Sequence, residues 1–305
     1  MNKIYYNSFF AMGTRFNLLF PSIDYENGDR LFLLVRNEVV RIESLISFYE
    51  KGSEISRLNN RKSDEIDNVN DEVFEILERC RKYYLLTAGA FDITVKPLMD
   101  FWIAHDSQRN LENLPDQLKT TTGFDKVYLN SNNRSVSFGN RGIRIDLGGF
   151  GKGYALASVK SLLIDKGVIS AFISFGESSI LGLGSHPNGN CWKVGINNLL
   201  EPGSTVYSFD MADESVSTSG SYTITDEGKL HKSINVIDPV NHLPVNSIKS
   251  VSVKSDSPEE AEVFSTAFLV MQKDEINKVV LNSNAISAVE VCYDTGLPEL
   301  FFYTK

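Results

Sequence analysis

The pattern of apolar and polar positions predicts two amphipathic helices in the N-terminal third of the chain. In the segment 29–49, apolar side chains recur with the period of an α-helix. They share one face of the predicted helix: Leu34, Val35, Ile42, Leu45 and Ile46. A second helix is predicted over 71–89, because acidic residues stand near its start and Gly89 lies just past its end, as helix termini favour.

Alternating positions predict strands around these helices. Residues 8–20 alternate well enough for one strand. The segment 122–149 predicts a β-hairpin that turns at Asn132–Asn133, and then a strand that runs into a group of glycines. A helix is expected over 154–167 after these glycines. Five further strands are expected, at 170–176, 191–197, 215–220, 233–238 and 249–255.

The segment 255–271 carries the clearest helix start. Ser257 is a favoured N-cap residue, Pro258 suits the first helical position, and Glu259 and Glu260 complement the helix dipole. Strands and helices are mixed without a regular βαβ repeat, so the pattern predicts an α+β fold rather than a doubly wound α/β sheet. Since no linker, low-complexity segment or internal repeat divides the chain, we expect a single domain over 1–305.

Composition narrows the class of protein. The chain has 305 residues, of which 42% are hydrophobic, so it can bury a large core. The net charge of -9, the pI near 5.1 and the lack of a basic run with interleaved aromatic residues argue against a nucleic-acid partner. Cys80, Cys191 and Cys292 lie far apart without CxxC spacing, a pattern that fits neither a zinc site nor a disulfide framework.

The N-terminal residues and the hydropathy bear on localisation. No window approaches the ~18 apolar residues of a membrane span, so no transmembrane segment is expected. The first twenty residues contain no continuous apolar region and no small-residue cleavage site. As written, the sequence predicts a cytoplasmic protein. An exported precursor whose signal segment had been removed would have the same sequence and would be extracytoplasmic.

The segment "IDLGGFGKGYAL" at 145–156 is the main candidate for a ligand site. Glycines let the backbone approach a ligand closely, and free N–H groups at a helix N-terminus favour phosphate. The segment therefore suits a pyrophosphate. It matches neither GxGxxG nor GxxxxGK[ST], and a glycine-rich turn between a strand and a helix is, taken alone, more often a packing device.

Seven segments taken together identify a family resemblance. They are "AMGTRF" at 11–16, "SFYEKGSEISRLN" at 47–59, "GAFDITVKPLMDFW" at 89–102, "IDLGGFGKGYAL" at 145–156, "VSTSGSY" at 216–222, "NVIDPVNHLP" at 235–244 and "AEVFSTAFLVM" at 261–271. Because these segments occur in this order, the chain resembles the flavin transferases of the ApbE family nearly from end to end. The resemblance implies an enzyme that moves FMN from FAD onto a threonine of a target protein, with Mg²⁺ and with release of AMP.

The resemblance also implies the residues that bind FAD. Met12 and Tyr49 would lie against the flavin ring, where a thioether and an aromatic face suit a flat heterocycle. Core packing is the alternative for both. The other residues implied at the cofactor are Ala90, Phe91, Asp92, Gly149, Lys152 and Ile237. Lys152 would act as a cation beside the phosphates, whereas Asp92 could instead be a turn or cap aspartate.

A magnesium site is implied at Gly151, Glu262 and Thr266. Mg²⁺ prefers hard oxygen ligands and often bridges substrate phosphates. The family uses a backbone carbonyl of the glycine-rich loop, here that of Gly151, with a carboxylate and a threonine one helical turn apart. The i, i+4 spacing puts Glu262 and Thr266 on one helix face. The resemblance implies that Glu262 is the catalytic residue. A base near it would help to deprotonate the acceptor threonine.

The chain departs from the family pattern at five positions. Glu262 replaces an aspartate, Asn235 a histidine, His242 and Glu177 glycines, and Gly151 an alanine that acts through its backbone carbonyl. His231 is close in sequence to the missing histidine and is a candidate to replace it. These departures keep two alternatives open. One is a FAD-binding protein without transfer activity, and the other is a FAD pyrophosphatase that releases FMN and AMP to water.

Overall fold

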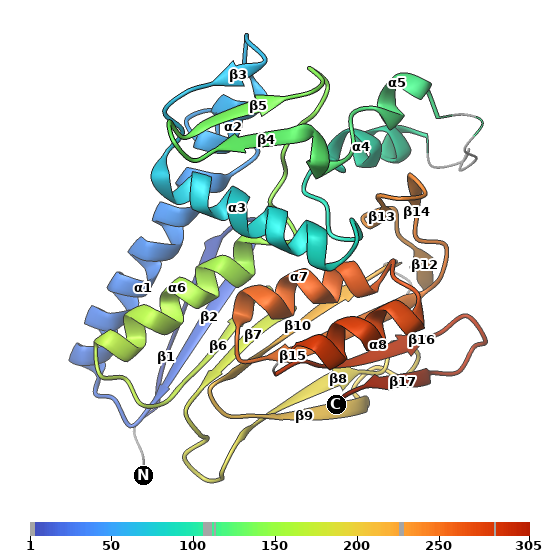
Figure 1. Cartoon of the computed structure of the whole chain (residues 1–305). Helices are drawn as coiled ribbons and strands as arrows, with labels where there is room; N and C mark the ends of the chain where they lie inside the picture. Colours follow the sequence, from blue (N-terminus) through green and yellow to red (C-terminus); the bar gives the residue numbers. More distant parts are fainter. Residues whose placement is uncertain (1–3, 106–111, 113, 226–228, 284) are drawn as a thin grey trace.

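An eight-stranded antiparallel sheet forms the centre of the molecule (Figure 1). This computed structural model describes residues 4–105, 112, 114–225, 229–283 and 285–305. Neighbouring strands follow the order β1-β2-β6-β7-β10-β15-β16-β17, so the N-terminal hairpin lies at one edge and the C-terminal hairpin at the other. The strands are β1 (Ile4–Ala11), β2 (Thr14–Pro21), β6 (Ala171–Phe175), β7 (Ser179–Leu183), β10 (Glu214–Gly220), β15 (Lys249–Ser255), β16 (Ser287–Cys292) and β17 (Glu299–Tyr303).

Helices cover one face of this sheet (Figure 1). Helix α7 packs on β10 and β15, α1 packs on β1, and α6 contacts both α1 and α7. Apolar side chains of these elements form the larger hydrophobic core, which stabilises the arrangement by removing apolar surface from water. The helices of this layer are α1 (Tyr25–Ile46), α6 (Gly151–Asp165), α7 (Pro258–Phe268) and α8 (Lys273–Asn282). Helix α3 (Asp71–Leu86) lies farther from the sheet and contacts residues 124–130.

A hairpin of β8 (Trp192–Asn197) and β9 (Thr205–Met211) carries a second, smaller core. In this core its apolar side chains, such as that of Trp192, are buried with Val216 of β10 and Val289 of β16. The larger and the smaller core lie on opposite faces of the sheet, because successive side chains of a β-strand point to opposite faces.

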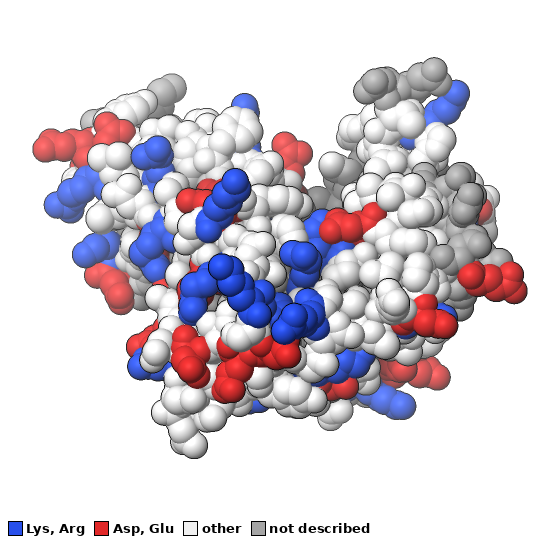
Figure 2. Space-filling view, turned by 90° about the horizontal axis from the view of Figure 1, so that it is seen from above, with Lys and Arg blue, Asp and Glu red and all other residues white. Residues whose placement is uncertain are grey.

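Most of the remaining short elements lie in the upper part of the molecule in Figure 1, whereas the strand at 230–232 lies lower, at the level of α7. They are α2 (Glu54–Asn59), β3 (Glu65–Ile66), α4 (Lys96–Ala104), α5 (Asp116–Lys119), a 3₁₀ turn at Phe124–Lys126, β4 (Val127–Asn130), β5 (Ser135–Phe138), β11 (Tyr222–Ile224), β12 (Leu230–Lys232), β13 (Ile237–Asp238) and β14 (Leu243–Pro244). Seen from above, the surface is notched between its left and right parts, and Lys and Arg side chains gather near the middle of this face (Figure 2).

The structure confirms the predicted α+β class and the main predicted helices. Helix α7 begins as expected, since the Ser257 side chain accepts a hydrogen bond from the Glu260 N–H at 3.3 Å. Helix α3 is followed by Gly89 with φ of +88°, a conformation that favours glycine. In α1 one predicted position is wrong, because Leu34 is exposed and Leu31 is buried in its place.

Three strand predictions need correction. Residues 8–20 belong to two strands, β1 and β2, which turn at Met12 and Gly13, both with positive φ. The segment before the glycines is not a regular strand, because the Asn59 side chain makes its backbone bonds, donating to the Ile145 carbonyl at 2.8 Å and accepting from its N–H at 2.7 Å. Of the strand predicted over 233–238, only Ile237–Asp238 pairs.

No helix within the described residues is both long enough and apolar enough to cross a membrane.

Candidate functional site

The glycine-rich segment forms a tight turn that leads into α6. The Asp146 carboxylate accepts a hydrogen bond from the Gly148 N–H at 2.9 Å, and the Leu147 carbonyl accepts bonds from Phe150 and Gly151. Asp146 therefore anchors the turn. Burial raises the pKa of its carboxyl group, while the Gly148 N–H and the Lys96 ammonium act in the opposite direction. Among the described residues, none accepts a hydrogen bond from the backbone N–H of Gly149, Lys152 or Gly153.

These backbone groups make the start of α6 suitable for an anion. The first N–H groups of a helix have no partner within the helix, and they lie at the positive end of its dipole. At this turn, glycines also remove the side chains that would keep a ligand away from the backbone. The turn thus leaves backbone N–H groups without an acceptor, within the described part of the chain, at the positive end of α6, and the predicted phosphate binding at this turn stays a prediction.

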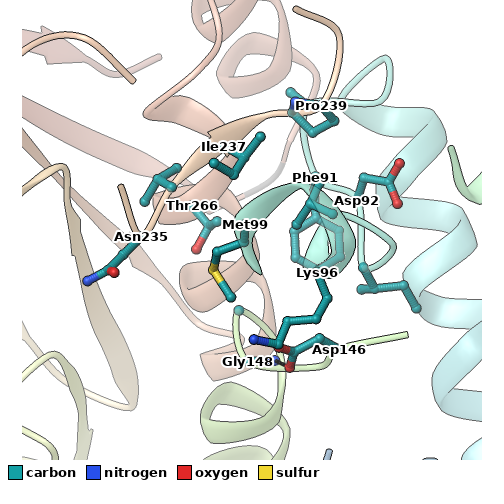
Figure 3. Close-up of a pocket in the computed structure, with 15 residues that line it drawn as sticks. Phe91, Asp92, Lys96, Met99, Asp146, Gly148, Asn235, Ile237, Pro239 and Thr266 are labelled. Carbon is teal, nitrogen blue, oxygen red and sulfur yellow. Dashed lines mark hydrogen bonds between the residues drawn. The ribbon is translucent and has the colours of Figure 1, made fainter. Parts of the chain in front are cut away.

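Two cavities meet at the glycine turn, and both are bordered by Asp146 and Gly148. The first cavity, of about 160 Å³, is lined by six of the predicted site residues: Ala90, Phe91, Asp92, Gly149, Ile237 and Thr266. The second, of about 330 Å³, is lined by the other four that contact a cavity: Met12, Tyr49, Gly151 and Lys152. Figure 3 shows the first cavity, with Phe91, Met99 and Ile237 converging on it from three segments of the chain.

Glu262 lies beside these cavities in a buried ion pair. Its side chain is only 5% exposed, and one carboxylate oxygen contacts the ammonium group of Lys152. The other oxygen accepts hydrogen bonds from the hydroxyl groups of Ser179 and Ser217, the latter at 2.9 Å. The carboxylate thus has three protein partners, which compensate for the burial of its charge.

Thr266 follows Glu262 by one helical turn and faces the glycine turn. A Cβ atom added to Gly149 would lie 3.4 Å from the Thr266 hydroxyl oxygen, so the two residues are in direct contact range. The Thr266 hydroxyl also lies 3.3 Å from the Glu262 carbonyl and 3.2 Å from the Ser219 hydroxyl. Several oxygen atoms therefore converge near the start of α6.

The close approach of α6 and α7 brings Lys152 to Glu262. A Cβ atom at Gly153 would lie 2.7 Å from the Glu262 Cβ and 2.7 Å from the Pro258 carbonyl oxygen. Only glycine fits at such a contact without displacement of backbone. Gly153 therefore sets the distance between the two helices.

Asp92 lines the first cavity, but the protein itself satisfies its carboxylate. The Thr94 N–H at 2.8 Å and its hydroxyl at 2.6 Å donate to one oxygen, and the Phe124 N–H at 3.2 Å donates to the other. Burial raises the pKa of Asp92 to about 6, in spite of these hydrogen bonds. This geometry is that of the turn aspartate that the sequence left as an alternative.

Met12 and Tyr49 both line the second cavity, and Met12 is partly buried and also packs against the larger hydrophobic core. Met12 has φ of +47° at the β1–β2 turn, and its N–H donates to the Glu43 carboxylate at 2.6 Å. The Tyr49 side chain is 80% exposed, which excludes core packing as the reason for this aromatic residue. Phe48 meets it edge to face with ring centroids 5.2 Å apart.

The positions that depart from the family pattern have distinct surroundings. Asn235 lines the first cavity, whereas His231 is exposed on β12 and lines neither cavity, so His231 does not take the place of the missing histidine. His242 and Glu177, which stand where the family has glycines, have φ of +61° and +60°. The fold thus keeps the left-handed backbone at both positions without glycine.

Sequence reasoning missed Lys96, Asp100 and the two serines that hold Glu262. Lys96 lines the first cavity, and its Nζ lies 2.5 Å from an Asp100 carboxylate oxygen. The i, i+4 spacing of this pair was visible in the segment 89–102, but its position beside the glycine turn depends on the tertiary fold. Ser179 and Ser217 come from β7 and β10, and nothing local in the sequence joins them to Glu262.

The donor set near α6 suits a hard cation only in part. Within the described ranges there is no group of three or more His, Cys, Asp or Glu residues that could hold a metal ion. One carboxylate and several hydroxyl oxygens are present, which are ligands that Mg²⁺ accepts, with phosphate and water completing its shell. Glu262 and Thr266 supply two such oxygen donors, and Gly151 lies at the first position of α6, in the glycine turn beside them.

The sequence and the fold of this chain match those of a known protein family. The family model described as "ApbE family" matches residues 12–289, and the chain belongs to this family. Among solved structures, the ApbE protein of Thermotoga maritima is 25% identical with a TM-score of 0.80, covering 99% of this chain and 97% of that one. The flavin transferase ApbE of Vibrio cholerae has a TM-score of 0.83 at 21% identity, with coverage of 99% and 98%.

Curated relatives carry a more specific name, FAD:protein FMN transferase. The protein of that name from Escherichia coli strain K12 is 26% identical over 279 residues, which span 88% of this chain and 79% of the relative. That of Vibrio cholerae is 25% identical over 300 residues, which span 95% and 88%.

Proposed function

We propose that this chain is a Mg²⁺-dependent FAD:protein FMN transferase that acts as a single domain. The observation that carries the proposal is the junction of two cavities at a turn with free backbone N–H groups, next to the Lys152–Glu262 pair. FAD is an elongated molecule with its diphosphate in the middle, and such a molecule matches two cavities that meet at an anion-binding turn. The curated name of the relatives supports the same activity.

The proposed placement of FAD follows from the chemistry of each cavity. The flavin ring lies at Met12 and Tyr49, because an exposed aromatic ring and a thioether at a cavity wall are suited to stacking. The diphosphate lies at the glycine turn, beside Gly149 and Lys152. The remaining adenosine half extends into the cavity of Ala90, Phe91, Asp92 and Ile237.

The transferred group is the FMN phosphoryl group. The hydroxyl oxygen of the acceptor threonine forms a bond to the FMN phosphorus, the bridging P–O bond of the diphosphate breaks, and AMP leaves with the bridging oxygen. The threonine proton goes to the Glu262 carboxylate, the catalytic group of the proposal, directly or through a water molecule. Lys152 and the α6 N–H groups stabilise the negative charge that develops on the phosphate oxygens.

Mg²⁺ would be held by Glu262, Thr266 and the Gly151 carbonyl, and it would neutralise diphosphate charge. Without FAD, Lys152 already balances the charge of Glu262. The site therefore lacks the net negative charge that attracts a divalent cation. Metal affinity is expected to be weak for the free protein and stronger once the diphosphate is bound.

Incubation with FAD, Mg²⁺ and a candidate acceptor protein tests the proposal. A transferase yields a fluorescent acceptor band in a denaturing gel together with AMP. A binding protein without transfer yields neither product, and a pyrophosphatase yields FMN and AMP without a labelled band. Either of these results would contradict the proposal.

Glu262 variants assign its role in the same assay. Glu262→Gln removes the charge and is expected to abolish the Mg²⁺-dependent release of AMP. Glu262→Asp restores the carboxylate with one methylene less and is expected to retain metal-dependent release. Full metal-dependent activity in Glu262→Gln would contradict the metal assignment.

A further inference from the structure

Lys96 occupies an unusual place for a lysine. Its side chain is only 7% exposed and lines the first cavity from the start of α4. Figure 3 shows its ammonium group beside Asp146 and Gly148, at the glycine turn where the two cavities meet. The ammonium also lies 5.3 Å from the ring centroid of Phe48 and 5.9 Å from that of Tyr49.

The hydrogen bonding of this ammonium group is incomplete. An ammonium has three N–H donors, and among the described residues Lys96 donates only to the Asp100 carboxylate, at 2.5 Å. A buried charge is stable only when it is well paired, so the remaining donors favour a ligand with negative oxygens. Asp146, whose carboxyl group lies beside Lys96 in Figure 3, already accepts the Gly148 N–H, and burial raises its pKa.

Lys96 and Lys152 differ in what they would leave behind on turning to a ligand. The partner of Lys152 is Glu262, whose side chain is 5% exposed and would become an unpaired buried carboxylate. The partner of Lys96 is Asp100, whose side chain is 54% exposed, so water can solvate it. Separating a pair therefore costs less when water can solvate the carboxylate left behind than when that carboxylate stays buried.

We propose that Lys96 is a second cation for the FAD diphosphate, and that Asp100 holds it in place and competes with the ligand for it. This inference rests on the proposed function, because it takes FAD as the ligand of the two cavities. Two phosphates carry two negative charges, and two lysines, one lining each of the cavities that border the glycine turn, match them. Lys96 is then a binding residue that acts before any metal arrives.

Opposite effects of two substitutions test the proposal. Binding is measured by calorimetry without Mg²⁺ for FAD, ADP and riboflavin, of which only riboflavin lacks phosphate. Lys96→Met keeps the buried aliphatic part of the side chain. It is expected to weaken the binding of FAD and ADP about tenfold and to leave the affinity for riboflavin unchanged. Asp100→Asn is expected to increase the affinity for FAD and ADP by about twofold to fivefold, because the negative charge that competes for Lys96 is removed.

The double variant and a matched control complete the experiment. Once Lys96 is absent, Asp100→Asn should have no effect, so the double variant should bind like Lys96→Met. Lys51→Met removes an exposed lysine that lines neither cavity and should leave all three affinities unchanged. Wild-type affinities for FAD and ADP in Lys96→Met, or equal losses for FAD and riboflavin, would overturn this inference alone. Absence of FAD binding by the wild-type protein would overturn the proposed function with it.

Discussion

Lys152 and Glu262 each supply the other's counter-charge, so a change at either residue affects stability as well as ligand binding. Lys152→Met leaves the Glu262 carboxylate buried with only the Ser179 and Ser217 hydroxyls as partners. Lys152 itself is 21% exposed, and we expect a loss of about 2 kcal/mol in the free energy of unfolding, less than for a fully buried pair. Urea denaturation measures this loss.

The same variant separates a phosphate contact from a structural role. If Lys152 faces the diphosphate, Lys152→Met lowers the affinity for FAD more than the affinity for riboflavin, because riboflavin carries no phosphate. Fluorescence titration of the folded variant gives both affinities. Equal losses for the two ligands would mean that Lys152 only supports Glu262.

Asp92 is expected to make the stability depend on pH. Burial raises its pKa from 3.8 to about 6, so the folded protein binds a proton more tightly than the unfolded chain. The contribution of Asp92 to the free energy of unfolding then falls by up to about 3 kcal/mol as the pH rises from about 4 to about 6, and it stays level above that range. The unfolding free energy of the wild type minus that of Asp92→Asn should therefore decrease as the pH rises over this interval. A difference that does not change with pH would contradict the shifted pKa.

Glu177 is expected to strain the turn after β6. Its φ of +60° lies in the left-handed region, which costs a non-glycine residue about 1–2 kcal/mol, and its side chain is exposed. Because glycine loses more entropy on folding, Glu177→Gly should be more stable than Glu177→Ala by only about 0.5–1 kcal/mol. Thermal unfolding of the two variants provides the comparison, and greater stability of the alanine variant would show that the turn carries no such strain.

At the scale of elements, the contact between α6 and α7 decides whether the site forms. Gly153→Ala would place a Cβ atom 2.7 Å from the Pro258 carbonyl oxygen, which must move. We expect a loss of at least about 2 kcal/mol in unfolding free energy and weaker FAD binding, because the Lys152–Glu262 distance increases. Gly52→Ala is the matched control, since no atom lies within 4 Å of its added Cβ and its φ is not in the left-handed region. Similar stabilities for the two alanine variants would refute the role of Gly153.

The elements that the sequence predicts well are those with strong local signals. Helix α7 was predicted from its cap residues and α3 from its charged start and following glycine, because these contacts lie within a few residues. Strands β7, β9, β16 and β17 were not predicted, since their burial depends on neighbours that the fold supplies. The turn at Met12 and Gly13 was missed although Gly13 is a typical turn residue, because methionine rarely adopts the left-handed conformation that Met12 has here.

The site was predictable to the extent that family segments mark it. Ten of the predicted residues line the two cavities, and Glu262 pairs with one of them. What local patterns did not indicate was the state of the charges. The pairing of Lys152 with Glu262 joins positions 110 residues apart, and Lys96 reaches the glycine turn only through the placement of α4.

For the whole molecule, FAD and Mg²⁺ are expected to stabilise the fold cooperatively. At a concentration of about 100 times its dissociation constant, FAD should add about 2.7 kcal/mol and raise the melting temperature by roughly 5 °C. Mg²⁺ alone should have little effect but should increase the shift in the presence of FAD, and Glu262→Gln should lose only this increment. Scanning calorimetry measures all four conditions, and an equally large Mg²⁺ shift without FAD would contradict the coupling.

The serines that hold Glu262 have a consequence for refolding. They come from β7 and β10, while Glu262 belongs to α7, so three segments must be docked before the carboxylate has its partners. Contacts between residues far apart in sequence form slowly, because a long loop must close first. A flavin added during refolding therefore reports the arrival of the complete native state, and its fluorescence should change later than the helical circular dichroism signal.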